Sequence, residues 1–126
     1  MLMTDLILKE EAYRIVGVCM NVHKTLGMGL KEVNYKDAME IDFIEANIPF
    51  EREKKFTVTY KNRILRNPYY ADFVVYDAMI LEVKSATMLT EAHTAQTLSY
   101  LAASGVKLAL LINFGERSLR WKRIIL

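Results

Sequence analysis

The chain has 126 residues, of which 52% are hydrophobic and 25% charged, a composition typical of one water-soluble globular domain over residues 1–126. No apolar run approaches the ~20 residues of a membrane helix, so we expect no membrane span. Met1–Asp5 has neither a basic region nor a cleavage signature, so we expect no signal peptide and a cytoplasmic location. The single cysteine excludes an internal disulfide, and the net charge of +2 neither requires nor excludes nucleic acid as a partner.

Two helices are predicted in the first third of the chain. Apolar residues at helical spacing run from residue 8 to 26 and stop at Gly27. A second helix is predicted over residues 31–46, before the proline of Asn47–Pro49. We expect this helix to be covered on more than one side because it carries two stripes of residues. One stripe contains Leu30, Val33, Ile41 and Ile44, and the other contains Glu32, Tyr35, Met39 and Phe43.

Strand periodicity begins at Phe50. Apolar residues at 56, 58 and 60 alternate with polar ones, which predicts a strand with one solvated face that turns at Lys61–Arg63. Asn67–Pro68 introduces a second strand. This strand forms a β-hairpin with a third one, around a tip at Asp77–Ala78.

A helix is predicted over residues 90–104, with Thr90 as the N-cap and Gly105 as the C-terminal stop. The nearly apolar residues 107–113 predict a strand buried on both faces, and a last strand is predicted over 119–125. The fold class is therefore α/β, an α+β mixed sheet flanked by helices, in the order α-α-β-β-β-α-β-β.

The predicted hairpin brings two acidic residues and one lysine together. If its turn centres on Asp77, Asp72 lies directly opposite Glu82, with Cβ atoms roughly 4.5–5.5 Å apart. Lys84 shares their face two residues later. Carboxylate oxygens are the ligands that Mg²⁺ prefers, and an ammonium beside them suits a phosphate or an attacking water. An exposed cross-strand ion pair of little energetic value is the alternative. We disfavour it because the predicted helices cover both faces of the sheet.

Gln96 and Tyr100 lie one turn apart on the helix that follows this hairpin, and His93 lies a turn earlier. A glutamine and a tyrosine at this spacing can orient a water or contact a phosphate. A polar stripe with a half-buried tyrosine is an equally good interpretation of the spacing. The residues expected to face the sheet are Ala95, Leu98 and Ala102.

Two basic stretches are either solvated strand faces or places where a phosphate backbone is held. The first contains Lys54, Lys55, Lys61, Arg63 and Arg66, and the second contains Arg117, Arg120, Lys122 and Arg123. Cys19 and His23, both on the first helix, are interpreted as packing residues.

The chain resembles a known protein family in several segments. Gly29–Tyr35 reads G-L-K-E-V-N-Y and matches the G-x-x-E-x-x-Y signature of the GxxExxY proteins, a branch of the PD-(D/E)XK nuclease superfamily. The resemblance runs almost end to end. The other matching segments are V-H-K-T-L-G at 22–27, A-D at 71–72, L-E-V-K-S-A at 81–86, A-Q-T-L-S-Y-L at 95–101 and L-L-I-N-F-G at 110–115.

This resemblance implies a single PD-(D/E)XK nuclease-like domain with an α-β-β-β-α-β core. It implies a hydrolase that cleaves phosphodiester bonds of nucleic acid, expected to be DNA, through a metal-activated water. Glu32, Asp72 and Glu82 would hold Mg²⁺ or Mn²⁺, and Lys84 would be the catalytic lysine.

The resemblance also places Gln96 and Tyr100 in the catalytic site, because they are similar to the Q-x-x-x-Y helix of exonuclease-type members. Tyr70 departs from the pattern, since family members often have a basic residue there, and substrate contacts at that position are expected to differ. A DNA-binding or regulatory protein that retains the fold without catalysis is the alternative function. The chain is expected to act as a homo-oligomer or within a larger nucleic-acid-processing assembly.

Overall fold

The structure is a computed structural model and describes residues 8–126, which form three helices and seven strands in the predicted order, with one small hairpin added. The helices are α2 (Lys9–Leu26), α3 (Glu32–Glu45) and α4 (Glu91–Ser104). The strands are β1 (Phe50–Phe56), β2 (Thr59–Tyr60), β3 (Arg63–Ile64), β4 (Tyr69–Val75), β5 (Met79–Lys84), β6 (Leu108–Asn113) and β7 (Arg120–Ile125).

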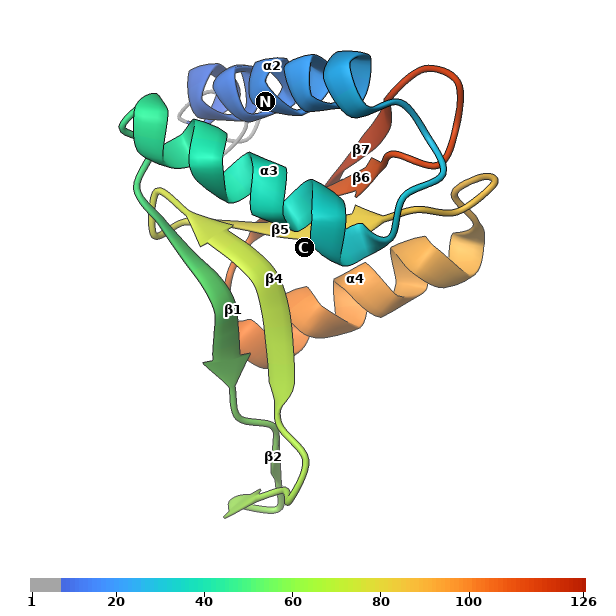
Figure 1. The fold of residues 1–126 in the computed structure, drawn as a ribbon. Coiled ribbons are helices and arrows are strands. Elements are labelled where there is room, and N and C mark those ends of the chain that lie inside the picture. The colour runs from blue at the N-terminus through green and yellow to red at the C-terminus, as the bar shows by residue number, and fades with distance from the viewer. Residues whose placement is uncertain (1–7) are drawn as a thin grey trace.

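Five strands form one mixed sheet in the order β1-β4-β5-β6-β7. Strands β5 and β6 are parallel, and the other neighbours are antiparallel. Helix α4 connects the parallel pair and covers one face, whereas α2 and α3 cover the other (Figure 1). All six residues of β6 are buried, as predicted for a strand covered on both faces.

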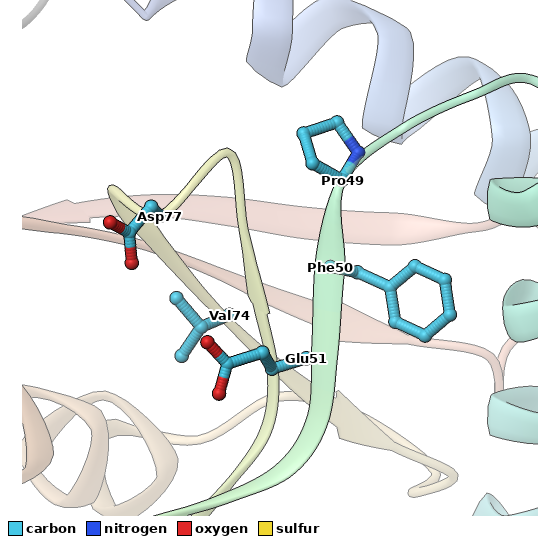
Figure 2. Close-up of a pocket in the computed structure, with 5 residues that line it drawn as sticks. All are labelled: Pro49, Phe50, Glu51, Val74 and Asp77. Carbon is cyan, nitrogen blue, oxygen red and sulfur yellow. The ribbon is translucent and has the colours of Figure 1, made fainter.

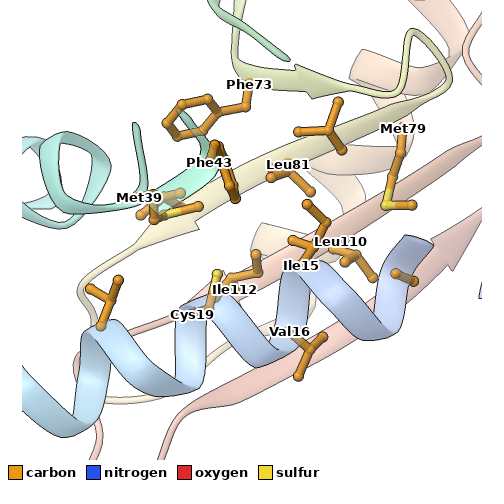
Figure 3. Close-up of a cluster of buried hydrophobic side chains, with 14 of the residues drawn as sticks. Ile15, Val16, Cys19, Met39, Phe43, Phe73, Met79, Leu81, Leu110 and Ile112 are labelled. Carbon is orange, nitrogen blue, oxygen red and sulfur yellow. The ribbon is translucent and has the colours of Figure 1, made fainter. Parts of the chain in front are cut away.

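The core between the sheet and helices α2 and α3 is built from one face of each helix (Figure 3). Ile15 and Cys19 of α2 pack there with Met39 and Phe43 of α3, and burial raises the pKa of the Cys19 thiol. The interpretation of Cys19 as a packing residue is therefore confirmed.

The expected second buried stripe of α3 is wrong. Its residues Val33, Ile41 and Ile44 are all exposed, because the side chains that α3 buries are those of the stripe with Tyr35, Met39 and Phe43.

The orientation predicted for α4 is wrong for two of the three residues expected to face the sheet, because Leu98 packs against the core under α4 but Ala95 and Ala102 do not. Ala95 and Ala102 are exposed, while Thr97 and Leu101 are buried, so the helix is rotated from the expected orientation. The capping prediction is confirmed, because the Thr90 side chain accepts a hydrogen bond from His93 N and Gly105 ends the helix in the left-handed conformation.

Strand β4 changes face at Asp72. Regular alternation would put residues 69, 71, 73 and 75 on one face of the sheet. Instead Phe73 packs in the core under α2 and α3, and Ala71 packs in the core under α4. On the neighbouring strand, Glu53 has a φ of 54°, and the ladder pairs Arg52 with Phe73 and Lys54 with Ala71 on either side of it. The β1–β4 ribbon therefore turns over at the level of Asp72, between the two faces.

The strand expected to run continuously from Phe50 to Tyr60 is interrupted after Phe56. The chain then forms a separate two-stranded sheet, β2–β3, which projects from the body of the protein (Figure 1). The alternating pattern had predicted the extended conformation correctly, but not its departure from the main sheet.

Candidate active site where β4 and β5 separate

The hairpin register confirms that Asp72 and Glu82 occupy the same level. The turn centres on Asp77, because Val75 pairs with Met79, and the ladder of β4 and β5 ends at the pair Phe73–Leu81. One level further, side chains replace the backbone ladder. Asp72 N donates to Glu82 Oε2 at 3.2 Å, and Val83 N donates to Asp72 Oδ2 at 2.7 Å. The two carboxylates therefore lie together in the gap where the strands separate.

Glu82 is buried, with 4% of its surface exposed. Tyr69 donates its hydroxyl to Glu82 Oε2 at 2.9 Å. Burial, and then the negative charge of Asp72, raise the pKa of Glu82 to about 7, against the smaller opposing effects of its hydrogen bonds and of Lys84. This carboxyl is thus an acid that needs a nearby positive charge to be fully ionised at neutral pH.

Lys36 of α3 reaches the same gap from the other face of the sheet. Its ammonium lies 3.1 Å from Asp72 Oδ1 and also pairs with Glu53. Burial acts to lower the pKa of Lys36, but the hydrogen bonds and charges of Glu53 and Asp72 outweigh it and leave the pKa raised. Lys36 is not among the site residues predicted from the sequence. Its spacing of one helical turn from Glu32 was the available signal.

Helix α4 completes the site on its own side of the sheet. Lys84 Nζ donates to Gln96 Oε1 at 3.3 Å. The Tyr100 ring stacks on Tyr69 at a centroid distance of 3.6 Å, and burial, followed by the charges of Glu82 and Asp72, raises the pKa of Tyr100. Gln96 therefore contacts Lys84, and Tyr100 lies close enough to Glu82 and Asp72 for their charges to act on its pKa. Tyr69 was also missed, although its position three residues before Asp72 puts it on the same strand.

Glu32 lies at the end of β5, beside this group. Its Oε2 accepts a hydrogen bond of 3.3 Å from Ser85 N, the residue after Lys84. Within residues 8–126, no three His, Cys, Asp or Glu side chains form a group that could hold a metal ion on their own. The structure thus brings Asp72 and Glu82 together and leaves Glu32 bonded to the neighbouring backbone.

Asn113 holds the segment that follows Lys84. It is fully buried, its Oδ1 accepts from Ala86 N at 2.9 Å, and its Nδ2 donates to Ala86 O at 2.9 Å. Gly115 lies against the same segment, since a Cβ there would be 2.1 Å from Ala86 O. Asn113 is not among the predicted site residues, although a polar residue at the end of an apolar strand is a signal for such a role.

The remaining candidates have packing roles or lie elsewhere. His23 is buried, and its Nε2 is 2.8 Å from Glu116 O, as expected for a hydrogen-bonded packing residue. His93 accepts a hydrogen bond from Thr90 N at the start of α4. A pocket near the hairpin tip contains none of the predicted site residues (Figure 2). It is lined by Pro49, Phe50, Glu51, Val74 and Asp77.

None of the helices over residues 8–126 is both long and apolar enough to cross a membrane. A search of curated proteins finds no match. The fold is similar to a solved protein described as "Crystal structure of SSO0001", with a TM-score of 0.57, 12% sequence identity, and coverage of 97% of this chain and 61% of that one. This chain therefore spans about three fifths of the length of that protein, and the likeness concerns the fold alone.

A family model described as the PD-(D/E)XK nuclease superfamily matches residues 9–124. The match includes the hairpin with Asp72 and Glu82 and the helix with Gln96. The paired carboxylates, the adjacent lysine and this match agree, and the chain belongs to the PD-(D/E)XK nuclease superfamily.

Proposed function

We propose that this protein is a divalent-metal-dependent nuclease that hydrolyses phosphodiester bonds of nucleic acid, with DNA as the expected substrate. One observation carries the proposal. Where β4 and β5 separate, the Glu82 carboxylate accepts a hydrogen bond from Asp72 N and the Asp72 carboxylate accepts one from Val83 N, and the Lys84 ammonium is close enough to act on the pKa of Glu82. Membership of the nuclease superfamily supports the same class of activity.

The donor atoms of this site fit a hard cation. Both side chains offer carboxylate oxygens, the ligand type of Mg²⁺ and Mn²⁺, and Mg²⁺ needs only one or two protein carboxylates besides water and substrate oxygens. Burial, and then the negative charge of Asp72, raise the pKa of Glu82 to about 7, so a cation bound beside it would favour its ionised form. Asp72 and Glu82 would hold the ion, with Glu32 as a third proposed ligand from the start of α3.

When bound, such an ion would acidify a water and neutralise charge on the phosphate. The side chains around it have separate tasks. Lys84 would stabilise the negative charge that develops on the phosphate, and Gln96, which already accepts from Lys84, would orient the attacking water. The Tyr100 hydroxyl would contact a substrate phosphate, with its ring held in place by stacking on Tyr69.

We further infer that the chain belongs to the GxxExxY branch, because each signature residue has a physical role here. Tyr35 donates its hydroxyl to Gly27 O at 2.6 Å and accepts from Leu30 N at 3.2 Å, which fixes the loop before α3. Gly29 has a φ of 103°, a conformation that favours glycine. The loop held in this way brings Glu32 to Ser85 at the end of β5.

A nucleic-acid-binding protein without catalysis is the second candidate. It is favoured by the ammonium of Lys36, which already bonds to Asp72 Oδ1 and would compete with a metal ion for that oxygen. Metal affinity therefore separates the two candidates directly.

The test is cleavage of labelled single- and double-stranded DNA and RNA with Mg²⁺ or Mn²⁺, and with EDTA in their place. The wild-type protein should cleave at least one substrate only with metal, and Asp72→Asn should abolish cleavage. Asp77→Asn is the matched control, because Asp77 is an exposed carboxylate at the tip of the same hairpin. Binding of nucleic acid without cleavage by the wild-type protein would support the non-catalytic candidate.

A further inference from the structure

The β2–β3 hairpin forms an arm, defined here as residues 59–67, that no described helix covers (Figure 1). Every residue from Thr59 to Asn67 is exposed. Strands β2 and β3 pair only with each other, so the arm adds little to the core. Because the arm packs so little, the stability of the fold does not explain why it is present.

The arm and its base carry only positive charge. Residues 54–71 contain five basic residues and no acidic one. The other 108 residues contain 12 basic and 15 acidic residues, so their net charge is −3. Lys54 pairs with Glu51 and Asp77, whereas no carboxylate of residues 8–126 pairs with the other four basic residues. These four are Lys55, Lys61, Arg63 and Arg66.

An aromatic ring lies among these charges. Tyr60 is directly opposite Arg63 in the β2–β3 ladder, and residues directly opposite each other share a face of the pair. The Tyr60 side chain is 61% exposed, and the Lys61 ammonium lies 5.4 Å from the centre of its ring. An exposed ring flanked by cationic groups is the combination with which proteins stack bases and hold phosphates of nucleic acid.

The shape of the arm is fixed in advance. Lys61 and Asn62 both have positive φ angles, of 49° and 61°, which form the tight two-residue turn that suits a twisted hairpin. Leu65 N donates to Val58 O at 2.7 Å, which extends the pairing by one more step. A preformed arm loses little conformational entropy on binding.

The arm leads away from the proposed active site. Tyr69, which bonds to Glu82, begins the strand into which the arm continues. The tip at Asn62 is seven residues from Tyr69, and at ~3.3 Å per residue the arm reaches at most about 23 Å. With ~3.4 Å per nucleotide along one strand, this length corresponds to roughly seven nucleotides.

We propose that the arm binds the nucleic-acid strand beside the cleavage site, with Tyr60 stacking on a base and Arg63 holding a phosphate up to about seven nucleotides away. The inference rests on the proposed function, in that nucleic acid is the substrate. Its consequence is a length threshold: only a strand long enough to reach the tip gains the additional affinity.

The test compares oligonucleotides of about four to 20 nucleotides with the wild-type protein and with the double variant Tyr60→Ala/Arg63→Ala. Affinity is measured by fluorescence anisotropy without metal, and cleavage is measured in Mg²⁺ or Mn²⁺ at saturating substrate. Lys24→Ala is the control, since Lys24 is an exposed cation at the end of α2, in another part of the structure.

Wild-type affinity should rise by about tenfold or more once the strand passes roughly seven nucleotides, as expected for one stacked base and one phosphate contact. The double variant should lose this rise and keep its melting temperature and its cleavage rate at saturation. The same length dependence in the double variant would overturn the proposal for the arm. So would self-association of the wild-type protein that the substitutions abolish without any change in nucleic-acid binding.

The two proposals fail in different ways. Wild-type protein that cleaves or binds nucleic acid without any effect of the arm variant removes only the role of the arm. Wild-type protein that neither binds nor cleaves any oligonucleotide overturns the proposed function, and the role of the arm with it.

Discussion

The Lys36 ammonium lies 3.1 Å from Oδ1 of Asp72 and forms a second ion pair with Glu53. It enters from the α3 side of the sheet, whereas Lys84 lies with Gln96 on the α4 side. The two carboxylates in the strand gap are therefore flanked by an ammonium on each face. The Lys36 ammonium is thus hydrogen-bonded to a carboxylate oxygen that would otherwise be available as a metal ligand.

Replacing Lys36 should strengthen metal binding. Lys36→Met removes the ammonium from Asp72 Oδ1, and Mg²⁺ affinity measured by calorimetry should rise about fivefold, the factor that corresponds to roughly 1 kcal/mol. Lys54→Met is the control, because Lys54 pairs with Glu51 and Asp77 away from the site. Weaker Mg²⁺ binding in Lys36→Met would instead mean that Lys36 holds Asp72 in the orientation that binds the ion.

Substitutions of Asp72 should separate chemistry from stability. Asp72→Ala leaves Val83 N without its acceptor, and an unsatisfied buried donor costs about 1–3 kcal/mol of folding free energy. Asp72→Asn retains an oxygen for that hydrogen bond, so it should be inactive but more stable than Asp72→Ala. Urea unfolding of both variants measures the difference. Equal stabilities would show that the bond to Val83 contributes nothing.

The raised pKa of Glu82 predicts that the metal-free protein loses stability as the pH rises. Glu82 has a pKa of about 7 in the folded protein against 4.5 as its ordinary value, so folding favours its protonated form. This contribution is fully present below pH 4.5 and is lost as the pH rises through 7, by roughly 3 kcal/mol.

The measurement is urea unfolding between pH 4 and 8 in EDTA, with the difference between wild type and Glu82→Gln as the readout. Glu82→Gln should remove most of the fall in stability between pH 5 and 7.5. A fall of the same size in this variant would assign it to other groups.

Gln96→Ala should slow cleavage without changing the fold. Removing one positioned polar contact typically costs a few kcal/mol of barrier, or roughly a hundredfold in rate. Gln96 is exposed, so the melting temperature and the Mg²⁺ affinity should stay the same. Ser99→Ala is the control on the same helix. A fully active Gln96→Ala protein would exclude this side chain from the reaction, and a lower melting temperature with normal turnover would indicate a packing role.

Gly115→Ala should be strongly destabilising, although Gly115 lies outside the site. A Cβ at this position would be 2.1 Å from the backbone oxygen of Ala86, and backbone atoms cannot move aside as the end of a flexible side chain can. Loss of soluble protein or a large fall in melting temperature is expected, with Gly17→Ala as the control, because a Cβ there meets nothing within 4 Å. A stable Gly115→Ala protein would show that the segment after Lys84 tolerates displacement.

Much of the fold was predictable because its signals are local. Helical spacing, the N-cap Thr90, the stop at Gly105 and the hairpin centred on Asp77 each depend on residues that are close in sequence. The level shared by Asp72 and Glu82 follows from the turn alone, and so the sequence is enough to predict it.

The parts that were missed depend on long-range packing. Nothing in the alternating pattern indicates that β4 changes face at Asp72 or that the chain leaves the main sheet after Phe56, because such a pattern predicts extended backbone but not which strands pair or where the alternation breaks. Lys36 is 36 residues from Asp72 and comes from the opposite face. The prediction of which α4 residues face the sheet was wrong in part because burial on this helix is set by its packing on β6 and β7 rather than by its own apolar pattern.

The hydrogen bonds that close the β4–β5 ladder have a consequence for how this protein can change over evolution. Asp72 and Glu82 accept main-chain hydrogen bonds at the level where the ladder stops, so selection for folding acts on their shape even where selection for activity is absent. Lineages that lose the chemistry would then be expected to retain the hydrogen-bonding shape and discard only the charge, through D72N or E82Q. A homologue that has lost catalytic activity is therefore best recognised by amide side chains at these two positions, rather than by small or apolar residues.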